Sequence, residues 1–258
     1  MIQSVSGQFS RVSLLWFYSS WRPSWVFCKK SFNELFTFGS RLLASGLLSH
    51  IVDNIYNLII GKTYSSTQLG FYTQAKRIVD LPMLLINSVI QSVTFPVLAS
   101  IQYQDERLKA NFRKIIKMIV FLNFPVMLII GVTAKPLIVV MLTDKWIQAV
   151  PYCQLFCIIG LTYPLNSVNL SILNVKGRSD IFFRLEIVKK VTVVITILLT
   201  INHGIMTLII GHVVYSFAAT ILNLYFSGRL INYSLFDQFS DIFPYFMAAA
   251  IMAFVTYA

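Results

Sequence analysis

Residues 191–228 read VTVVITILLTINHGIMTLIIGHVVYSFAATILNLYFSG and contain no Lys, Arg, Asp or Glu. A helix of this length would extend for about 57 Å, whereas the hydrocarbon core of a bilayer is about 30 Å thick. Two crossings therefore fit the run better than one, and Asn202-His203-Gly204 supplies turn-forming residues between them. The sequence predicts spanning helices near 187–201 and 205–226, the first of which begins upstream of Lys189 with its lysines snorkelling.

The rest of the chain has the same character, since 57% of its residues are apolar and only 12% are charged. Soluble domains carry about 25% charged residues, so the bilayer is the solvent that fits this composition. Residues 1–20 lack the basic start of a signal peptide and have the pattern of the end of a preceding spanning helix. We therefore expect an all-α integral membrane protein, a multi-pass helical bundle of about six full spans plus two partial ones. The further spans are expected near 38–60, 78–100, 115–133, 150–173 and, incompletely, 243–258.

Lys and Arg are distributed unequally between alternate loops. One set of loops holds fourteen of them and the other set five. The positive-inside rule places the richer set, including residues 21–36, in the cytoplasm. The net charge of +11 thus comes from short runs beside an anionic leaflet, and we expect membrane lipids rather than nucleic acid as partners.

The first complete span carries a polar stripe. Ser49, Asp53 and Asn57 recur at i, i+4 and so lie on one face of the helix. Such a face must meet a partner helix or a wet cavity. Two interpretations stay open: the stripe contacts substrate or a coupling ion, or Asp53 only forms hydrogen bonds inside the bundle.

Lys76 and Arg77 stand at the start of the second span, on the side that the charge rule assigns to the extracytoplasmic space. Because they oppose the positive-inside bias, they require a reason to be there. Either they bind an anionic ligand, for which the guanidinium of Arg77 offers a bidentate fork, or they snorkel, with Asp80 pairing with Lys76 at i, i+4.

The sequence shows no nucleotide-binding motif, zinc-ligand spacing or nucleophile elbow. Cys153 and Cys157 have no further ligands nearby and are expected to be small apolar fillers. We therefore expect neither an enzyme nor a bound cofactor, although a coupling ion or the membrane potential is compatible with the pattern.

Several short motifs, in order along nearly the whole chain, resemble those of Wzx-type oligosaccharide flippases of the MOP (MATE-like) superfamily. They are Trp21-Arg22-Pro23-Ser24, Phe38–Leu43, Leu69–Tyr72, Phe95–Leu98, Asp105–Arg113, Lys145-Trp146, Gly177–Asp180 and Leu230–Ser234. Ala75-Lys76-Arg77-Ile78 and Pro82 also resemble the matching stretch of lipid II flippases.

This resemblance implies one lobe of a transporter that moves undecaprenyl-diphosphate-linked oligosaccharide across the bacterial inner membrane for lipopolysaccharide, capsule or exopolysaccharide synthesis. It implies two six-helix lobes with alternating access between them, and an arginine at the position of Arg77 that lines a cationic cavity. Residues 37–258 would form the C-terminal lobe, and residues 1–20 a remnant of the sixth helix. Transport would then need the N-terminal lobe or a second chain.

The chain departs from the family pattern at Thr143, where Gly is common. Two alternatives to transport stay open: an inactive truncated transporter, and a membrane-embedded polysaccharide polymerase or ligase. The second is disfavoured because such an enzyme would need a large extracytoplasmic loop, and the outer loops here are short.

Overall fold

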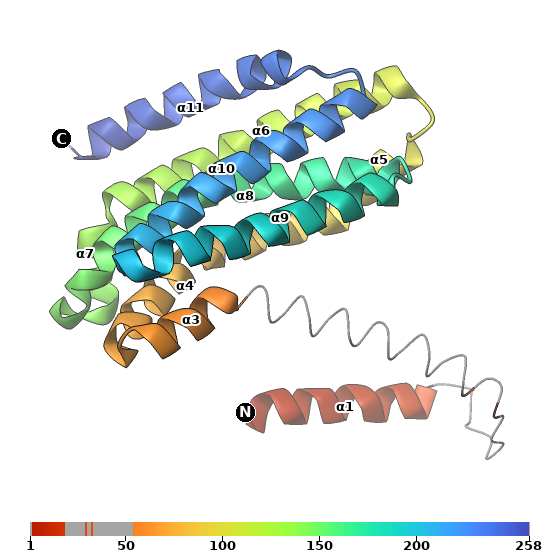
Figure 1. Ribbon diagram of the computed structural model, residues 1–258. Coiled ribbons are helices and arrows are strands. Elements are labelled where there is room, and N and C mark those ends of the chain that lie inside the picture. The colour runs from red at the N-terminus through yellow and green to blue at the C-terminus, as the bar shows by residue number, and fades with distance from the viewer. Residues whose placement is uncertain (1, 19–28, 30–31, 33–53, 258) are drawn as a thin grey trace. The chain divides into compact units, whose positions relative to one another are not determined.

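The computed structural model describes residues 2–18, 29, 32 and 54–257, and the chain divides into two units, residues 1–51 and 52–258. In the first unit the described helix is α1 (Ile2–Tyr18), on which large apolar side chains such as Phe9 and Phe17 are exposed. The second unit is a helical bundle (Figure 1), and no strand occurs in the described residues. The expectation of an all-α fold is confirmed.

The long helices of the second unit are joined by short turns (Figure 1). In chain order, its elements are α3 (Ile55–Thr63), α4 (Ser66–Val89), a π-helical turn (Ile90–Thr94), α5 (Phe95–Ser100), α6 (Asp105–Val132), α7 (Ala134–Leu142), a 3₁₀ turn (Asp144–Ala149), α8 (Val150–Val175), α9 (Ser179–Thr200), a 3₁₀ turn (Ile201–His203), α10 (Ile205–Leu230) and α11 (Leu235–Tyr257).

Helix α8 is the centre of the bundle. It packs against α4, α6 and α10, while α9 packs on α10 and α11 packs on α6. In the most apolar part of the stretch that contains α8, 61% is buried inside the bundle, whereas the corresponding share in the other candidate spans is 22–33%. Helices α4 and α6 both pack on this shared central helix, and they also contact each other.

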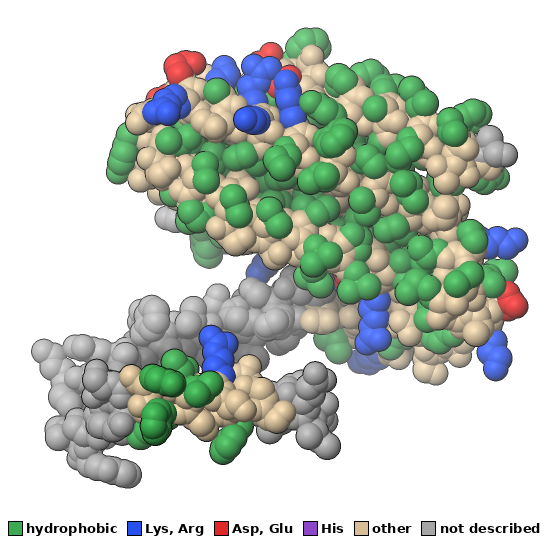
Figure 2. Space-filling model, turned by 180° about the vertical axis from the view of Figure 1, so that it is seen from behind, with side chains coloured by type: hydrophobic (Ala, Val, Ile, Leu, Met, Phe, Trp, Pro, Cys, Tyr) green, Lys and Arg blue, Asp and Glu red, His purple; other side chains and the backbone are tan. Residues whose placement is uncertain are grey.

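Among the residues that the structure describes, five helical stretches are long and apolar enough to cross a membrane. They are Ser66–Ser100, Asp105–Val132, Asp144–Val175, Ile205–Leu230 and Leu235–Tyr257. Their outer faces expose large apolar side chains, such as Leu85, Leu122 and Phe254, which water would not tolerate in this number. Figure 2 shows hydrophobic side chains along the bundle and Lys and Arg side chains gathered towards its ends. This distribution supports a multi-pass membrane protein.

Two helices begin upstream of the apolar runs from which their spans were predicted. The second span was expected from residue 78, but α4 begins at Ser66, where the Ser65 side chain caps the helix by accepting from the Gln68 amide at 3.2 Å. Similarly, α9 begins at Ser179, upstream of Lys189 as the sequence predicts. The apolar runs end where charged residues begin, whereas the backbone hydrogen bonds of both helices continue through those residues.

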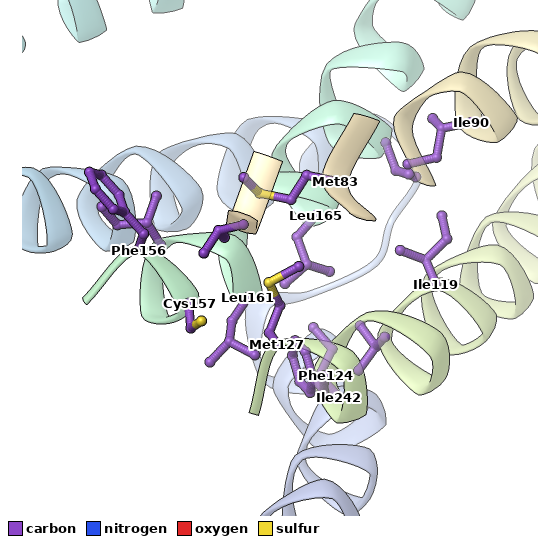
Figure 3. Packing of buried hydrophobic residues seen from close by; sticks show 14 of the residues in the cluster. Met83, Ile90, Ile119, Phe124, Met127, Phe156, Cys157, Leu161, Leu165 and Ile242 are labelled. Carbon is purple, nitrogen blue, oxygen red and sulfur yellow. The ribbon is translucent and has the colours of Figure 1, made fainter. Parts of the chain in front are cut away.

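Helix α8 is held closely against α6 at a proline. Pro164 has no N–H to donate to the carbonyl of Gly160, and the Asn123 amide of α6 donates to that carbonyl at 3.0 Å instead. A Cβ at Gly160 would lie 2.4 Å from the sulfur of Met127, so only glycine fits without movement of that side chain. Figure 3 shows Met127 beside Leu161 in this layer.

The turn between α7 and the following 3₁₀ segment has a strained backbone. Thr143 adopts φ 80° and ψ 168°, a conformation that favours glycine and is costly for a β-branched residue. This geometry accounts for the glycine that is common at this position in the family that the chain resembles.

Candidate functional site

A cavity of about 440 Å³ lies among α3, α4, α8, α9 and α10, and we call it the charged cavity. Its walls combine apolar residues with an unusual number of polar ones for a membrane bundle. The polar and ionisable residues that line it are Tyr56, Lys76, Asp80, Tyr163, Glu186, Lys189, Lys190, His212 and Tyr215.

The border of the buried face of α4 lines this cavity. Tyr72, Ala75, Val79 and Met83 recur at helical spacing and are buried in the bundle. Lys76 follows the buried Ala75 by one residue, about 100° round the helix, and it therefore lies at the border of this face. Its Nζ is 2.7 Å from Oδ2 of Asp80, which is the i, i+4 pair that the sequence predicts.

Helix α9 supplies the opposite wall. Glu186 and Lys189 form an ion pair at i, i+3, and the side chain of Lys189 is only 10% exposed. Lys190 also lines the cavity and forms no ion pair with any residue that the structure describes. Two ion pairs and one uncompensated ammonium group give the charged cavity a surplus of one positive charge when His212 is neutral.

The two walls place their cations at the same depth. The hydroxyl of Tyr64, just before α4, donates to the carbonyl of Ile201, just after α9, so these two helix ends are adjacent. Lys76 and Lys189 each lie about ten residues from that end, which corresponds to about 15 Å along a helix. This distance is about half the thickness of the hydrocarbon core, so the charges lie well inside the bundle and not at that end.

Two aromatic groups in the charged cavity have unused hydrogen-bonding atoms. The rings of Tyr56 and His212 are stacked, with centroids 4.5 Å apart and planes 11° from parallel. The Tyr56 hydroxyl and His212 Nδ1 are both buried and have no hydrogen-bond partner among the described residues. Buried polar atoms without partners are costly, and a hydroxyl-rich ligand or water entering the cavity would satisfy them.

The expected site residues fall into three groups. Lys76 lines the charged cavity, whereas Arg77 is exposed on the neighbouring face of α4 and forms no ion pair within the described part of the chain. Asn57 lies on α3 and donates to the Asn54 side chain at 3.1 Å, and its own buried oxygen has no hydrogen-bond partner among the described residues. Asp53 and Ser49 lie outside the described residues.

Sequence reasoning missed the contributions of α9 and α10. Lys189 and the adjacent Lys190 were expected to snorkel, and neither Glu186 nor His212 was predicted as a site residue. A signal was present, because Glu186 and Lys189 have ion-pair spacing directly before a long uncharged run. In addition, the described residues hold no group of three or more His, Cys, Asp or Glu that could bind a metal ion.

The wall between α8 and α10 is a ladder of polar contacts. The hydroxyls of Thr162 and Ser216 are 2.5 Å apart, and the amide of Asn166 donates to the Thr220 hydroxyl at 2.8 Å. Asn223 in turn donates to the Asn166 carbonyl oxygen at 2.6 Å. Such interhelical hydrogen bonds hold membrane helices together where lipid provides no hydrophobic drive, and they fix α10, which carries His212, against the central helix.

Comparison with known proteins gives consistent matches. A family model described as "Polysaccharide biosynthesis protein" matches residues 1–151. The teichuronic acid biosynthesis protein TuaB of Bacillus subtilis is 26% identical over 260 residues, which cover 100% of this chain and 54% of that protein. The lipopolysaccharide biosynthesis protein WzxC of Escherichia coli is 28% identical over 169 residues, covering 66% of this chain and 34% of that protein.

The succinoglycan biosynthesis transport protein ExoT of Rhizobium meliloti is 22% identical over 148 residues, which cover 57% of this chain and 30% of that protein. The chain thus spans about half, or less, of the length of these curated relatives. No solved structure matches the chain.

Proposed function

The chain belongs to the polysaccharide biosynthesis protein family, and from this premise we propose that it moves lipid-linked oligosaccharide, carried on undecaprenyl diphosphate, across the bacterial inner membrane. The step is translocation and not bond chemistry, which agrees with the description of one relative as a succinoglycan biosynthesis transport protein. The observation that carries the proposal is the charged cavity inside an apolar helical bundle.

Ionisable groups at the centre of a bilayer cost about 2.5–3.5 kcal/mol each on insertion scales, so their presence points to a task. Five ionisable residues from α4 and α9 line one cavity: Lys76, Asp80, Glu186, Lys189 and Lys190. The surplus positive charge suits a diphosphate, and the unpartnered atoms of Tyr56 and His212 suit sugar hydroxyls.

In this proposal Lys76 and Arg77 hold the diphosphate as it passes along α4. Lys76 can exchange Asp80 for a phosphate oxygen without any separation of helices, because its partner is on the same helix. Arg77 is exposed on the adjacent face and therefore accessible to a ligand that approaches from outside this unit. The stripe of Ser49, Asp53 and Asn57 would contact sugar hydroxyls or a coupling ion.

The resemblance to two-lobed transporters adds a mechanical requirement. A cavity closed by helices of one lobe can load and release a large head group only if a second lobe rocks against it. We propose that the N-terminal lobe of a longer protein, or a second chain, supplies this surface.

The proposal is tested by complementation in a strain that lacks its polysaccharide flippase. The chain is expressed alone and joined in frame behind the N-terminal part of a full-length relative, and surface polysaccharide is measured. Rescue by at least the joined form is expected. Absence of rescue from both forms, with both present in the membrane, would contradict the proposal and favour an inactive product or a polymerase.

The same assay tests whether Arg77 binds the ligand. Arg77→Ala should abolish rescue, and Arg77→Lys should retain part of it because the charge remains while the fork is lost. Lys62→Ala is the matched control, since Lys62 is also exposed and lies near the same end of the bundle. Equal rescue by Arg77→Ala and Lys62→Ala would remove Arg77 from the site.

A further inference from the structure

A second cavity, of about 540 Å³, lies along α6 beneath α11, and we call it the basic groove. Six of its lining residues come from α6, and Tyr245 comes from α11. The cationic ones are Arg113, Lys114 and Lys117, which succeed each other within about one helical turn. It is separate from the charged cavity, because the two cavities share no lining residue.

The positive charge of the basic groove is only partly compensated. Arg113 and Lys117 share a single carboxylate, that of Asp241, at 2.7 and 3.0 Å. Lys114 is exposed and forms no ion pair within the described residues. Three cations thus face one acid, which leaves two positive charges available to an anion.

The depth of these cations matches that of lipid head groups. Helix α6 has 28 residues, which is longer than a bilayer core requires. Counting about 20 residues back from its end at Val132, the length that crosses about 30 Å, reaches Arg113. Arg113 and Lys114 therefore lie at the boundary of the hydrocarbon core, at the end of the bundle that carries most of the Lys and Arg residues.

Below these cations the basic groove becomes apolar. Met118 is 64% exposed and Phe121 is 60% exposed, and the ring of Phe121 meets that of Tyr245 edge to face at 6.2 Å. Cations at the boundary of the hydrocarbon core are thus followed, towards the membrane centre, by exposed apolar side chains. This order matches the phosphate head group and the acyl chain of a phospholipid.

We propose that the basic groove is a binding site for an anionic phospholipid of the leaflet beside the basic loops, with the phosphate on Lys114 and its neighbours and an acyl chain along Met118 and Phe121. This site is independent of the transport proposal. A bound anionic lipid would compensate one of the two surplus charges of α6 and fill the space between α6 and α11.

The test uses the full chain purified in detergent, to which phosphatidylglycerol or phosphatidylcholine with the same acyl chains is added. Bound lipids are counted by native mass spectrometry. Phosphatidylglycerol is expected to bind more tightly than phosphatidylcholine. Lys114→Gln should weaken phosphatidylglycerol binding about fivefold, the factor for one cation at an anionic surface, and Lys114→Glu about 25-fold.

Three controls test whether lipid binding is specific to the basic groove. Lys109→Gln makes the same change of charge on the same helix outside the basic groove, and it should leave binding within about twofold of the original. Met118→Ser should weaken lipid binding without loss of folding, because that side chain is already exposed. Inorganic phosphate should not displace the lipid. Equal binding of both lipids, equal effects of Lys109→Gln and Lys114→Gln, or full displacement by phosphate would overturn the proposal.

Discussion

The charged cavity and the contact between α6 and α11 both contain ion pairs, but only the pairs between α6 and α11 join two helices. In the charged cavity each pair lies within one helix, Lys76 with Asp80 on α4 and Glu186 with Lys189 on α9. Neither pair ties one helix to another.

The contact between α6 and α11 is built around one carboxylate, and we call it the α6–α11 cluster. Asp241 of α11 accepts two hydrogen bonds from the Arg113 guanidinium of α6, at 2.7 and 3.0 Å. It also receives Lys117 at 3.0 Å and the Tyr233 hydroxyl at 2.6 Å. The side chain of Asp241 is 10% exposed, whereas those of its two cationic partners are about 40% exposed.

The difference separates a structural use of charge from an exchangeable one. A carboxylate shared between helices cannot leave its partners without loosening α11 from α6. A pair within one helix can open towards a ligand while every helix stays in place. The first arrangement should therefore control stability, and the second should control ligand handling.

The largest expected effect is at Asp241. Asp241→Asn removes the shared negative charge and leaves two cations facing each other, which should lower the free energy of unfolding by about 2 kcal/mol, a value already reduced for the partial exposure of the cations. Unfolding in mixed detergent micelles, followed by tryptophan fluorescence, measures the change.

Asp180→Asn is the matched control for this substitution. Asp180 pairs only locally with Arg178, and both side chains are about half exposed, so the change should leave the stability nearly unchanged. If the two variants lose the same stability, the α6–α11 cluster does not tie the two helices together.

The second effect is on transport and not on folding. Lys76→Gln should reduce rescue in the complementation assay about tenfold, equivalent to about 1.4 kcal/mol of lost ligand binding, while unfolding changes little. The double variant Lys76→Gln/Asp80→Asn removes both charges of the pair. It should stay as inactive as the single variant if Lys76 holds the ligand, and recovery of rescue would show that the pair only neutralises itself.

The features that sequence reasoning predicted are local ones. Apolar runs predict the helical fold, the Asn202-His203-Gly204 run predicts the turn where Gly204 adopts φ 92°, and i, i+4 spacing predicts the pair of Lys76 with Asp80. Each depends on residues within about one or two helical turns, for which the periodicity of the chain is sufficient.

The charged cavity could not be predicted in this way, because its walls come from distant parts of the chain. Lys76 and Lys189 share a depth only because α4 and α9 meet at Tyr64 and Ile201, a contact between residues 137 positions apart. Similarly, nothing local indicates that Tyr56 stacks on His212. The roles of Asp53 and Ser49 stay predictions, since neither residue belongs to the described part of the chain.

The smallest expected effects come from the same chemical change, the loss of one tyrosine hydroxyl, made in each of the two regions. Tyr233→Phe removes a hydroxyl that donates to Asp241, so it should lower the free energy of unfolding by about 1 kcal/mol. Tyr56→Phe removes a buried hydroxyl that has no partner among the described residues, so stability should be unchanged or slightly higher.

The rescue assay should rank the same two variants in the opposite order. Tyr56→Phe keeps the stacked ring but takes a hydrogen bond from the ligand, so rescue should fall about two- to threefold, whereas Tyr233→Phe should leave it unchanged at growth temperatures where the protein stays folded. A loss of stability in Tyr56→Phe comparable to that in Tyr233→Phe would mean that the Tyr56 hydroxyl already has a structural partner. The charged cavity would then be part of the packing rather than a binding site for a ligand.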